Sequence, residues 1–340
     1  MIGTFDETRL DDPQVLAVYD EQLRHLASFG ARIRIEAADA QPSDRLDAQP
    51  RGVVVVGAEA RLLRAVLEPV CPVPLVAWPL PGLPGWVGPL DLVVVLASEP
   101  ASQGDPALLA TTIEATRRGC MVLAATPASS QIAQSSHAIV VPTRTADPTA
   151  AAIVVLSLLH QVGLGPEVIP DHAAEAADMV AEESSPHRDL STNPAKDLAC
   201  GLGDAQPLIW GGSVLAARAS RRIAAGIRFY SGHPVLAADA REIAQVLQHV
   251  SPKDPFADPF TDGEQRSTVL VLLDDELTSP AAAADDRLLR ELAEQRGVRI
   301  CELNAGVGSE IDRYVTLLLR GLYGANYLAV ATGAEPALMR

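Results

Sequence analysis

The feature that most constrains the fold of this chain is a regular alternation of short apolar runs, rich in valine and leucine, with helical stretches. In the first half, a helical stretch over 13–30 precedes a strand and helix within 52–69, strands at 74–78, 90–98, 120–126 and 137–142, and a helix at 108–119. Short, fully apolar runs of this kind are typical of parallel strands that are buried on both faces. The first half therefore predicts a three-layer α/β domain with a parallel sheet.

The same alternation returns in the second half. We expect strands at 207–213, near 233–238, at 267–276 and at 298–305, and helices at 214–227, 240–250, 282–297 and from Ser309 onward. Between the halves, Asp147-Pro148 opens a long apolar helix that Gly163 or Gly165 ends, and an acidic stretch follows. The pattern predicts an N-terminal domain over 1–165, a helical connector over 166–205 and a C-terminal domain over 206–340.

Composition excludes several classes of function. The 340-residue chain is 48% hydrophobic and can bury a core in each domain, while its formal charge of −16 argues against nucleic acid as a partner. No apolar run reaches the roughly 20 residues of a membrane span, and the acidic N-terminus is unlike a secretory signal, so we expect a cytoplasmic protein with no membrane partner. The four cysteines lie far apart without a Cys-x-x-Cys pair, which predicts small buried side chains and neither a metal site nor a cofactor.

One segment suggests a binding site. The strand at 207–213 ends in Gly211-Gly212-Ser213 and runs directly into a helix, an arrangement that suits either a simple tight turn or a cradle for an anion. Arg222 on that helix belongs either to a solvated or interface face or to the binding site of a phosphate. No Asp or Glu occurs from Ala205 to Ala238, so the segment offers a cradle without a base.

Two further groups of residues have both a structural and a functional interpretation. His233, beside Pro234, is either a turn residue or a weak candidate for catalysis, because a neutral imidazole accepts a proton near pH 7. Asp274-Asp275-Glu276 ends the strand at 267–276, at the sheet edge where ligands of open α/β sheets bind. These three acids either hold Mg²⁺ or form a loop before the helix that begins near Pro280.

Four segments carry a resemblance to a known family. "NPAKDLA" at 193–199, "PLIWGGS" at 207–213, "GHPVL" at 232–236 and the stretch 308–336 resemble the bifunctional phosphoglucose/phosphomannose isomerases, a branch of the sugar isomerase (SIS) domain proteins. The resemblance implies two SIS-type, flavodoxin-like domains and a homodimer with the active site between subunits. It also implies a hexose 6-phosphate substrate and an aldose–ketose isomerisation that needs a carboxylate base and a phosphate site.

The residues at the expected chemical positions differ from that family. The first phosphate turn keeps Gly57 but has Glu59, which would repel a phosphate, and the second phosphate loop keeps only Ser98. Arg144 is the one basic candidate before the long helix. The segment 221–232, where the base is expected, contains no acid, and Gln245 stands where the catalytic histidine is expected.

Two hypotheses follow from these differences. The first is a non-catalytic SIS protein of hexose and mannose phosphate metabolism that binds a sugar phosphate, a related anionic metabolite or a partner protein. The alternative is an active glucose-6-phosphate/mannose-6-phosphate isomerase with altered catalytic residues, for which the acids are Glu59, Glu99 and Glu242. The predicted ligand-binding residues are Gly57, Ser98, Arg144, Gly211, Gly212, Ser213 and Arg222.

Overall fold

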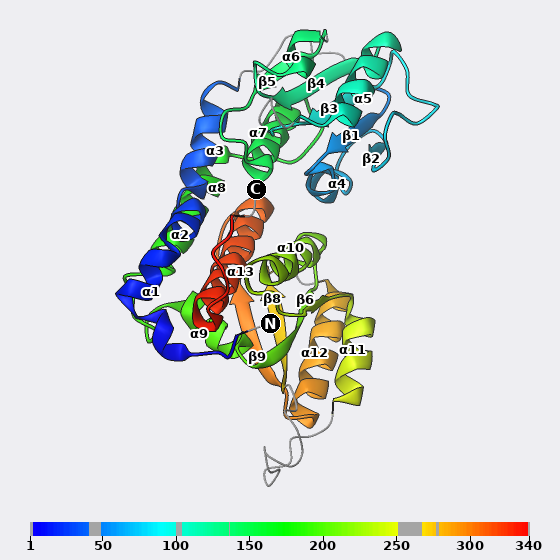
Figure 1. The fold of residues 1–340 in the computed structure, drawn as a ribbon. Helices are drawn as coiled ribbons and strands as arrows, with labels where there is room; N and C mark the ends of the chain where they lie inside the picture. Colours follow the sequence, from blue (N-terminus) through cyan, green and yellow to red (C-terminus); the bar gives the residue numbers. More distant parts are fainter. Residues whose placement is uncertain are drawn as a thin grey trace. The chain divides into compact units, whose positions relative to one another are not determined.

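The computed structural model of the chain describes residues 3–40, 49–99, 104–135, 137–250, 267–276 and 279–338 (Figure 1). Contacts between residues divide the chain into two compact units. The N-terminal unit comprises residues 29–175, and the C-terminal unit comprises residues 176–339 together with residues 1–28. The predicted domain boundaries at 165 and 205 stay a prediction. The first 28 residues have most of their contacts with the C-terminal unit.

The N-terminal unit is built on a five-stranded parallel sheet with the order β2-β1-β3-β4-β5. Its strands are β1 (Val53–Gly57), β2 (Leu75–Ala77), β3 (Leu92–Leu96), β4 (Met121–Thr126) and β5 (Ile139–Pro142). The central strands β1 and β3 are buried almost throughout, which explains why they read as unbroken apolar runs.

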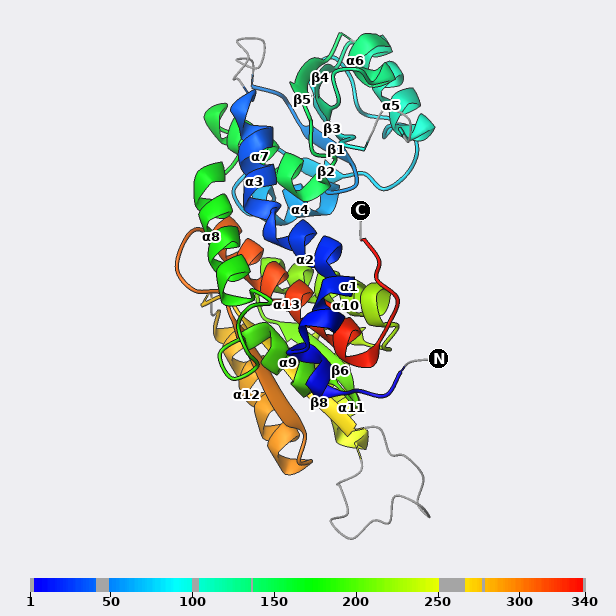
Figure 2. The ribbon, with the colours of Figure 1, turned by 60° about the vertical axis from the view of Figure 1, so that its left-hand side comes forward.

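Helices cover both faces of this sheet, as Figures 1 and 2 show. The side chains of Val54, Val56, Val93 and Val95 form one core with α5 and α6, and α7 packs on the opposite face with α3 and α4. Asp147 caps α7 and Pro148 occupies its first turn, as predicted. The helices are α3 (Phe29–Ala38), α4 (Ala60–Leu67), α5 (Pro106–Arg117), α6 (Gln131–Ser135) and α7 (Pro148–Gln161).

The C-terminal unit has a four-stranded parallel sheet with the order β7-β6-β8-β9. Its strands are β6 (Ala205–Gly211), β7 (Leu236–Ala237), β8 (Ser267–Asp274) and β9 (Arg299–Asn304). One face carries α11 and α12, which enclose a core around Leu208, Trp210 and Leu270. The other face carries α10 and α13. The prediction of an α/β fold with parallel sheets is thus confirmed in both units.

Helices of this unit come from both ends of the chain. The N-terminal part supplies the 3-10 helix η1 (Glu7–Leu10), α1 (Pro13–Val18) and α2 (Asp20–Ala27). The remaining helices are α9 (Pro194–Leu202), α10 (Val214–Ser231), α11 (Ala240–His249), α12 (Pro280–Gln295) and α13 (Glu310–Thr332), and α8 (Pro170–Glu183) leads into the unit. The structure differs from the sequence predictions in that α10 runs to Ser231, and α6 and α9 form where no individual helix was predicted.

The centre of the C-terminal unit is α13, which is buried along nearly its whole length. Its neighbours α10 and α9 approach closely because glycines stand at the crossings. A Cβ atom on Gly321 would lie 2.4 Å from Ile223 of α10, and one on Gly324 would lie 2.4 Å from Leu198 of α9. Apolar as it is, α13 does not qualify as a membrane span, and no other described helix is long and apolar enough to cross a bilayer.

A buried lysine joins four separate segments of this unit. Lys196 is fully buried, and its ammonium group donates hydrogen bonds to the carboxylate of Asp11 (2.7 Å) and to the carbonyls of Arg188 (2.7 Å) and Pro186 (3.2 Å). The ammonium nitrogen also lies 5.5 Å from the centre of the Tyr327 ring. Because an ammonium group has three N–H donors, this lysine is satisfied without water.

The groups around Lys196 are tied in turn. Partial burial raises the pKa of the Asp11 carboxyl, but hydrogen bonds from Lys196 and the Leu190 N–H hold that pKa below its usual value. Burial raises the pKa of Tyr327 well above its ordinary range, and its hydroxyl donates to the Ser184 carbonyl at 2.6 Å. The "NPAK" stretch that carried part of the family resemblance therefore builds an internal clamp.

The cysteines differ from expectation in one respect. Cys71, Cys120, Cys200 and Cys301 are all free, but each is half-buried and none is fully enclosed. Burial raises the pKa of Cys200 to about 11 and raises the pKa of Cys120 and Cys301 as well. These three thiols therefore stay protonated at neutral pH, which suits a packing role.

Replacing the clamp lysine tests its contribution to stability. We expect Lys196→Met to lower the free energy of unfolding by about 3 kcal/mol, because Asp11 and two carbonyls lose their donor. The control is Arg24→Met, which removes an exposed ion pair with Asp20 and should cost less than about 1 kcal/mol. Urea unfolding followed by circular dichroism measures both, and equal losses in the two variants would contradict a clamp.

Candidate functional site

The carboxyl edge of the C-terminal sheet carries the turn that the sequence singled out. The chain crosses from β6 to β7 on one side and β8 lies on the other, so the turn after β6 stands at the switch point where open α/β sheets bind ligands. Gly211 and Gly212 fill this turn for reasons of packing. A Cβ atom on Gly211 would lie 2.5 Å from the backbone of Ala216, and one on Gly212 would lie 2.9 Å from Ala282 of α12.

An acid from the next strand reaches this turn. Ser213 is the N-cap of α10, and its hydroxyl oxygen accepts a hydrogen bond from the Ala216 N–H at 3.0 Å. The same hydroxyl donates to the carboxylate of Asp275, which is only 6% exposed. A carboxylate of the protein itself therefore lies at the start of α10. Sequence analysis missed this pairing because Asp275 is 62 residues further along the chain.

The three consecutive acids at the end of β8 have different partners. Asp274 accepts a hydrogen bond from the Glu276 N–H at 2.8 Å, and Asp275 is bonded to Ser213. Arg313 of α13 donates to the Asp275 carbonyl at 3.1 Å and lies 3.9 Å from the Glu276 carboxylate. The N-cap of α12 is Ser279, so none of these acids caps that helix, and no group of three metal-ligating side chains occurs in the described part of the chain.

Two other predicted residues lie away from the Ser213 turn. His233 follows the opposite end of α10, so about 27 Å of helix separates it from Ser213 within one chain. The ring of His233 is buried, and its Nδ1 lies 3.1 Å from the Ser231 hydroxyl. Arg222 lies nine residues into α10, about 13 Å along the axis from Ser213. A single chain therefore does not bring these three residues together.

The N-terminal sheet has a corresponding edge. Gly57 ends β1 with φ 108°, and a Cβ atom there would lie 2.0 Å from the Leu96 carbonyl oxygen, so only glycine fits. Glu59, two residues on, is fully buried, and its carboxylate lies 3.5 Å from the hydroxyl of Thr149 on α7. Ser98 follows β3 at the same edge and is 3% exposed. Residues 100–103 of the predicted second phosphate loop lie outside the described part of the chain.

Arg144, the predicted basic residue of the anion site, is held by Glu36 of α3 and by Asp39, which follows that helix. Its backbone N–H and that of Thr145 donate to the Glu36 carboxylate at 3.1 and 2.7 Å, and the Thr145 hydroxyl donates to it too. The guanidinium of Arg144 pairs with Asp39. The Glu36 carboxylate is 2% exposed and accepts hydrogen bonds from two backbone N–H groups and one hydroxyl. Clustered donors of this kind would also suit a bound anion.

Glu36, Glu59 and Asp275, which we call the internal carboxylates, share one property. Each is buried at the carboxyl edge of a sheet. Glu36 and Asp275 bond to predicted anion-binding residues, and Glu59 lies two residues after one, Gly57. Glu99 is exposed and Glu242 lies in the first turn of α11, where its N–H is capped by Asp239. Of the acids that the structure places at the predicted sites, only Glu59 was among the residues singled out for catalysis.

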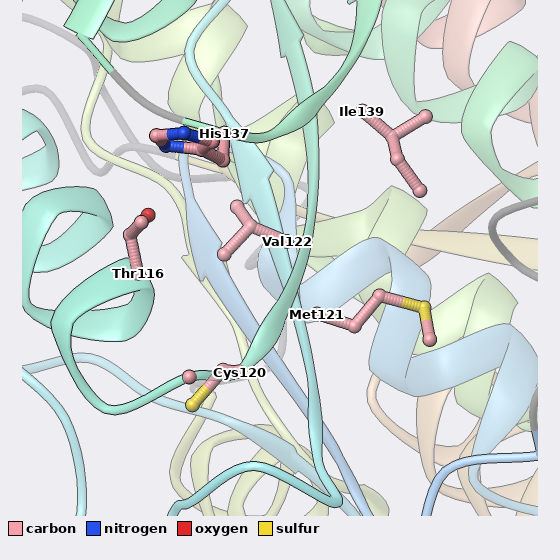
Figure 3. A pocket seen from close by; sticks show the side chains of 7 residues that line it. Thr116, Cys120, Met121, Val122, His137 and Ile139 are labelled. Carbon is pink, nitrogen blue, oxygen red and sulfur yellow. The ribbon is translucent and has the colours of Figure 1, made fainter.

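A separate cavity of about 460 Å³ lies at the opposite, amino-terminal edge of the N-terminal sheet (Figure 3). It is lined by the start of β4 and β5 and by α5, with Thr116, Cys120, Val122 and His137 among its walls. None of the predicted ligand residues lines it. Because open α/β sheets bind ligands at their carboxyl edges, this cavity is a weaker candidate site than the two switch points.

The internal role of Glu36 can be tested by a neutral substitution. Glu36→Gln should lower the free energy of unfolding by about 2 kcal/mol, because its amide group turns an N–H₂ donor toward N–H donors. Asp39→Asn, which alters only the exposed pair with Arg144, should cost less than about 1 kcal/mol. Thermal unfolding of both variants decides the matter, and an unchanged Glu36→Gln variant would show that the carboxylate is dispensable.

Comparison with known proteins agrees with this architecture. Residues 191–339 match the model of the bacterial phospho-glucose isomerase C-terminal SIS domain. The match begins just before α9 and includes Lys196, the Ser213 turn and α13, whereas Asp11, Pro186 and Arg188, which bond to Lys196, lie outside it. No curated protein matches the sequence.

Several solved structures share the fold along nearly the whole chain. A glucose-6-phosphate isomerase like protein from Thermus thermophilus is 16% identical, with a TM-score of 0.55 and coverage of 96% of this chain and 94% of that one. Tagatose-6-phosphate ketose/aldose isomerase from Escherichia coli is 12% identical, with a TM-score of 0.59 and coverage of 95% and 93%.

The C-terminal domain of glucosamine-fructose-6-phosphate aminotransferase from Francisella tularensis is 14% identical, with a TM-score of 0.60 and coverage of 94% and 96%. At these identities the likeness concerns the fold. Residues 191–339 are similar to the bacterial phospho-glucose isomerase C-terminal SIS domain, and the chain shares the fold of phosphosugar-isomerase-like SIS proteins.

Proposed function

We propose that this protein is a non-catalytic relative of the phosphosugar isomerases that acts in hexose and mannose phosphate metabolism by binding. Its ligand is a sugar phosphate, a related anionic metabolite or a partner protein, and its place of action is the cytoplasm. The proposal rests on the carboxylates at these positions. Ser213 bonds to Asp275, the Arg144 N–H bonds to Glu36, and the turn after Gly57 contains the buried Glu59. Groups that would recognise and turn over a substrate are thus committed to internal bonds.

The chemistry of isomerisation supports the same proposal. Moving a proton between adjacent carbons requires a base within hydrogen-bond reach of both carbons. The segment 221–232 supplies no carboxylate, and the imidazole of His233 is buried beside Ser231 at the far end of α10 from Ser213. Within one chain, the candidate base and the candidate phosphate turn therefore do not form one site.

A second candidate function rests on one specific observation. Asp275 brings a carboxylate to the Ser213 turn, which is the kind of group that the sequence segment itself lacks. An active glucose-6-phosphate/mannose-6-phosphate isomerase with an altered base would use this carboxylate, and the hydrogen bond with Ser213 would hold it in place. The two candidates make opposite predictions for the same assay.

A coupled isomerase assay separates them. We expect the purified protein to interconvert glucose 6-phosphate or mannose 6-phosphate with fructose 6-phosphate no faster than its Asp275→Asn variant does. A general base typically contributes 10²–10⁴-fold, so an active enzyme would lose about that factor in Asp275→Asn. A loss confined to His233→Ala would instead identify the imidazole as the base. A thermal-shift screen of sugar phosphates and nucleotide sugars is run alongside, and stabilisation without turnover supports a binding protein.

The proposal includes a homodimer, which the family resemblance implied. Phe229 and Val214 of α10 are 45% and 64% exposed, and large apolar side chains at a surface favour an interface. We expect light scattering at micromolar concentration to give the mass of two chains. Phe229→Glu should give the mass of one chain, and Val18→Glu, on α1, serves as a control with a similarly exposed valine. A monomeric parent protein would refute the dimer.

A further inference from the structure

The two sheets place a hydroxyl and an acid at equivalent positions, but in exchanged order. In the N-terminal unit Gly57 pairs with Leu96, so Glu59 and Ser98 each lie two residues beyond that pair. In the C-terminal unit Gly211 pairs with Leu273, so Ser213 and Asp275 each lie two residues beyond it. Each switch point thus carries one serine and one buried carboxylate.

We propose that Asp275 closes the Ser213 turn to phosphate and takes the place that a bound anion would occupy. The inference concerns specificity, and it holds whether or not the protein turns over a substrate. It means that a phosphorylated ligand of this protein binds its phosphate group at some other place than the N-terminus of α10. Asp275 is then a residue that determines which ligands the C-terminal unit admits.

The Ser213 hydroxyl is already used in two hydrogen bonds. A serine hydroxyl has one proton to donate, and that of Ser213 goes to the Asp275 carboxylate. The oxygen of the hydroxyl accepts the Ala216 N–H at 3.0 Å, which caps the helix. No hydroxyl proton remains for a phosphate oxygen unless Asp275 moves away.

The charge of Asp275 also opposes phosphate binding at this turn. The start of α10 favours a negative group, because helix N-termini present unpaired N–H donors and a partial positive charge. Asp275 places a carboxylate there at 6% exposure, where neighbouring charges interact more strongly than in water. Arg313, the nearby cation, already donates to the Asp275 carbonyl and faces Glu276. A phosphate would therefore meet the Asp275 carboxylate at close range, while Nη1 and Nη2 of Arg313 already contact Asp275 and Glu276.

The experiment removes the carboxylate and measures inorganic phosphate binding. Asp275→Ser frees the Ser213 hydroxyl and the space of the carboxylate. Glu276→Ser is the matched control, because it removes the same charge from the adjacent, exposed residue and leaves the Ser213–Asp275 bond in place. By titration calorimetry we expect Asp275→Ser to bind phosphate at least tenfold more tightly than the unmodified protein, and Glu276→Ser to match the unmodified protein.

An equal increase in phosphate affinity in both variants would show an effect of net charge alone and would overturn the proposal. A folded Asp275→Ser variant that binds phosphate no more tightly would overturn it too. A second measurement needs no variant. In crystals of the unmodified protein grown from inorganic phosphate, we expect the Asp275 carboxylate on Ser213 and no phosphate at the start of α10. A phosphate bound to Ser213 with Asp275 displaced would overturn the proposal even if the variants failed to fold.

Discussion

A charge that is removed from water must find partners inside the protein, and this constraint shapes the whole molecule. In the C-terminal unit, the buried ammonium group of Lys196 finds its partners in the carboxylate of Asp11 and in two carbonyls that precede α9. The bond to Asp11 draws the first residues of the chain onto the C-terminal unit. In "NPAK", the asparagine caps α9 and the lysine joins four chain segments.

The internal carboxylates extend this constraint to the candidate sites. Open parallel α/β sheets bind ligands at their carboxyl edges. In this chain Glu36 and Asp275 accept hydrogen bonds at these edges, and Glu59 is buried at the corresponding turn. The protein's own carboxylates thus lie at the carboxyl edges of both sheets.

Local patterns predicted the elements well because they depend on neighbouring residues. Apolar β-branched runs became β1, β3 and β8, and Asp147-Pro148 became the cap and first turn of α7. The α9 helix was missed because its capping asparagine and proline follow a turn-rich stretch whose composition is typical of loops. The role of Gly211 and Gly212 was left open, since a turn and an anion cradle require the same residues; contacts with Ala216 and Ala282 account for both glycines by packing.

The sequence by itself determined the class of fold, the order of the strands along the chain, the resemblance to SIS proteins and the absence of an acid between Ala205 and Ala238. Only the tertiary structure decided what lies beside Ser213. Parallel strands β6 and β8 are neighbours in the sheet although more than fifty residues separate them, so Asp275 reaches a turn that lacks an acid of its own. The length of α10 likewise separates His233 from that turn, because a helix of 18 residues keeps its two ends about 27 Å apart.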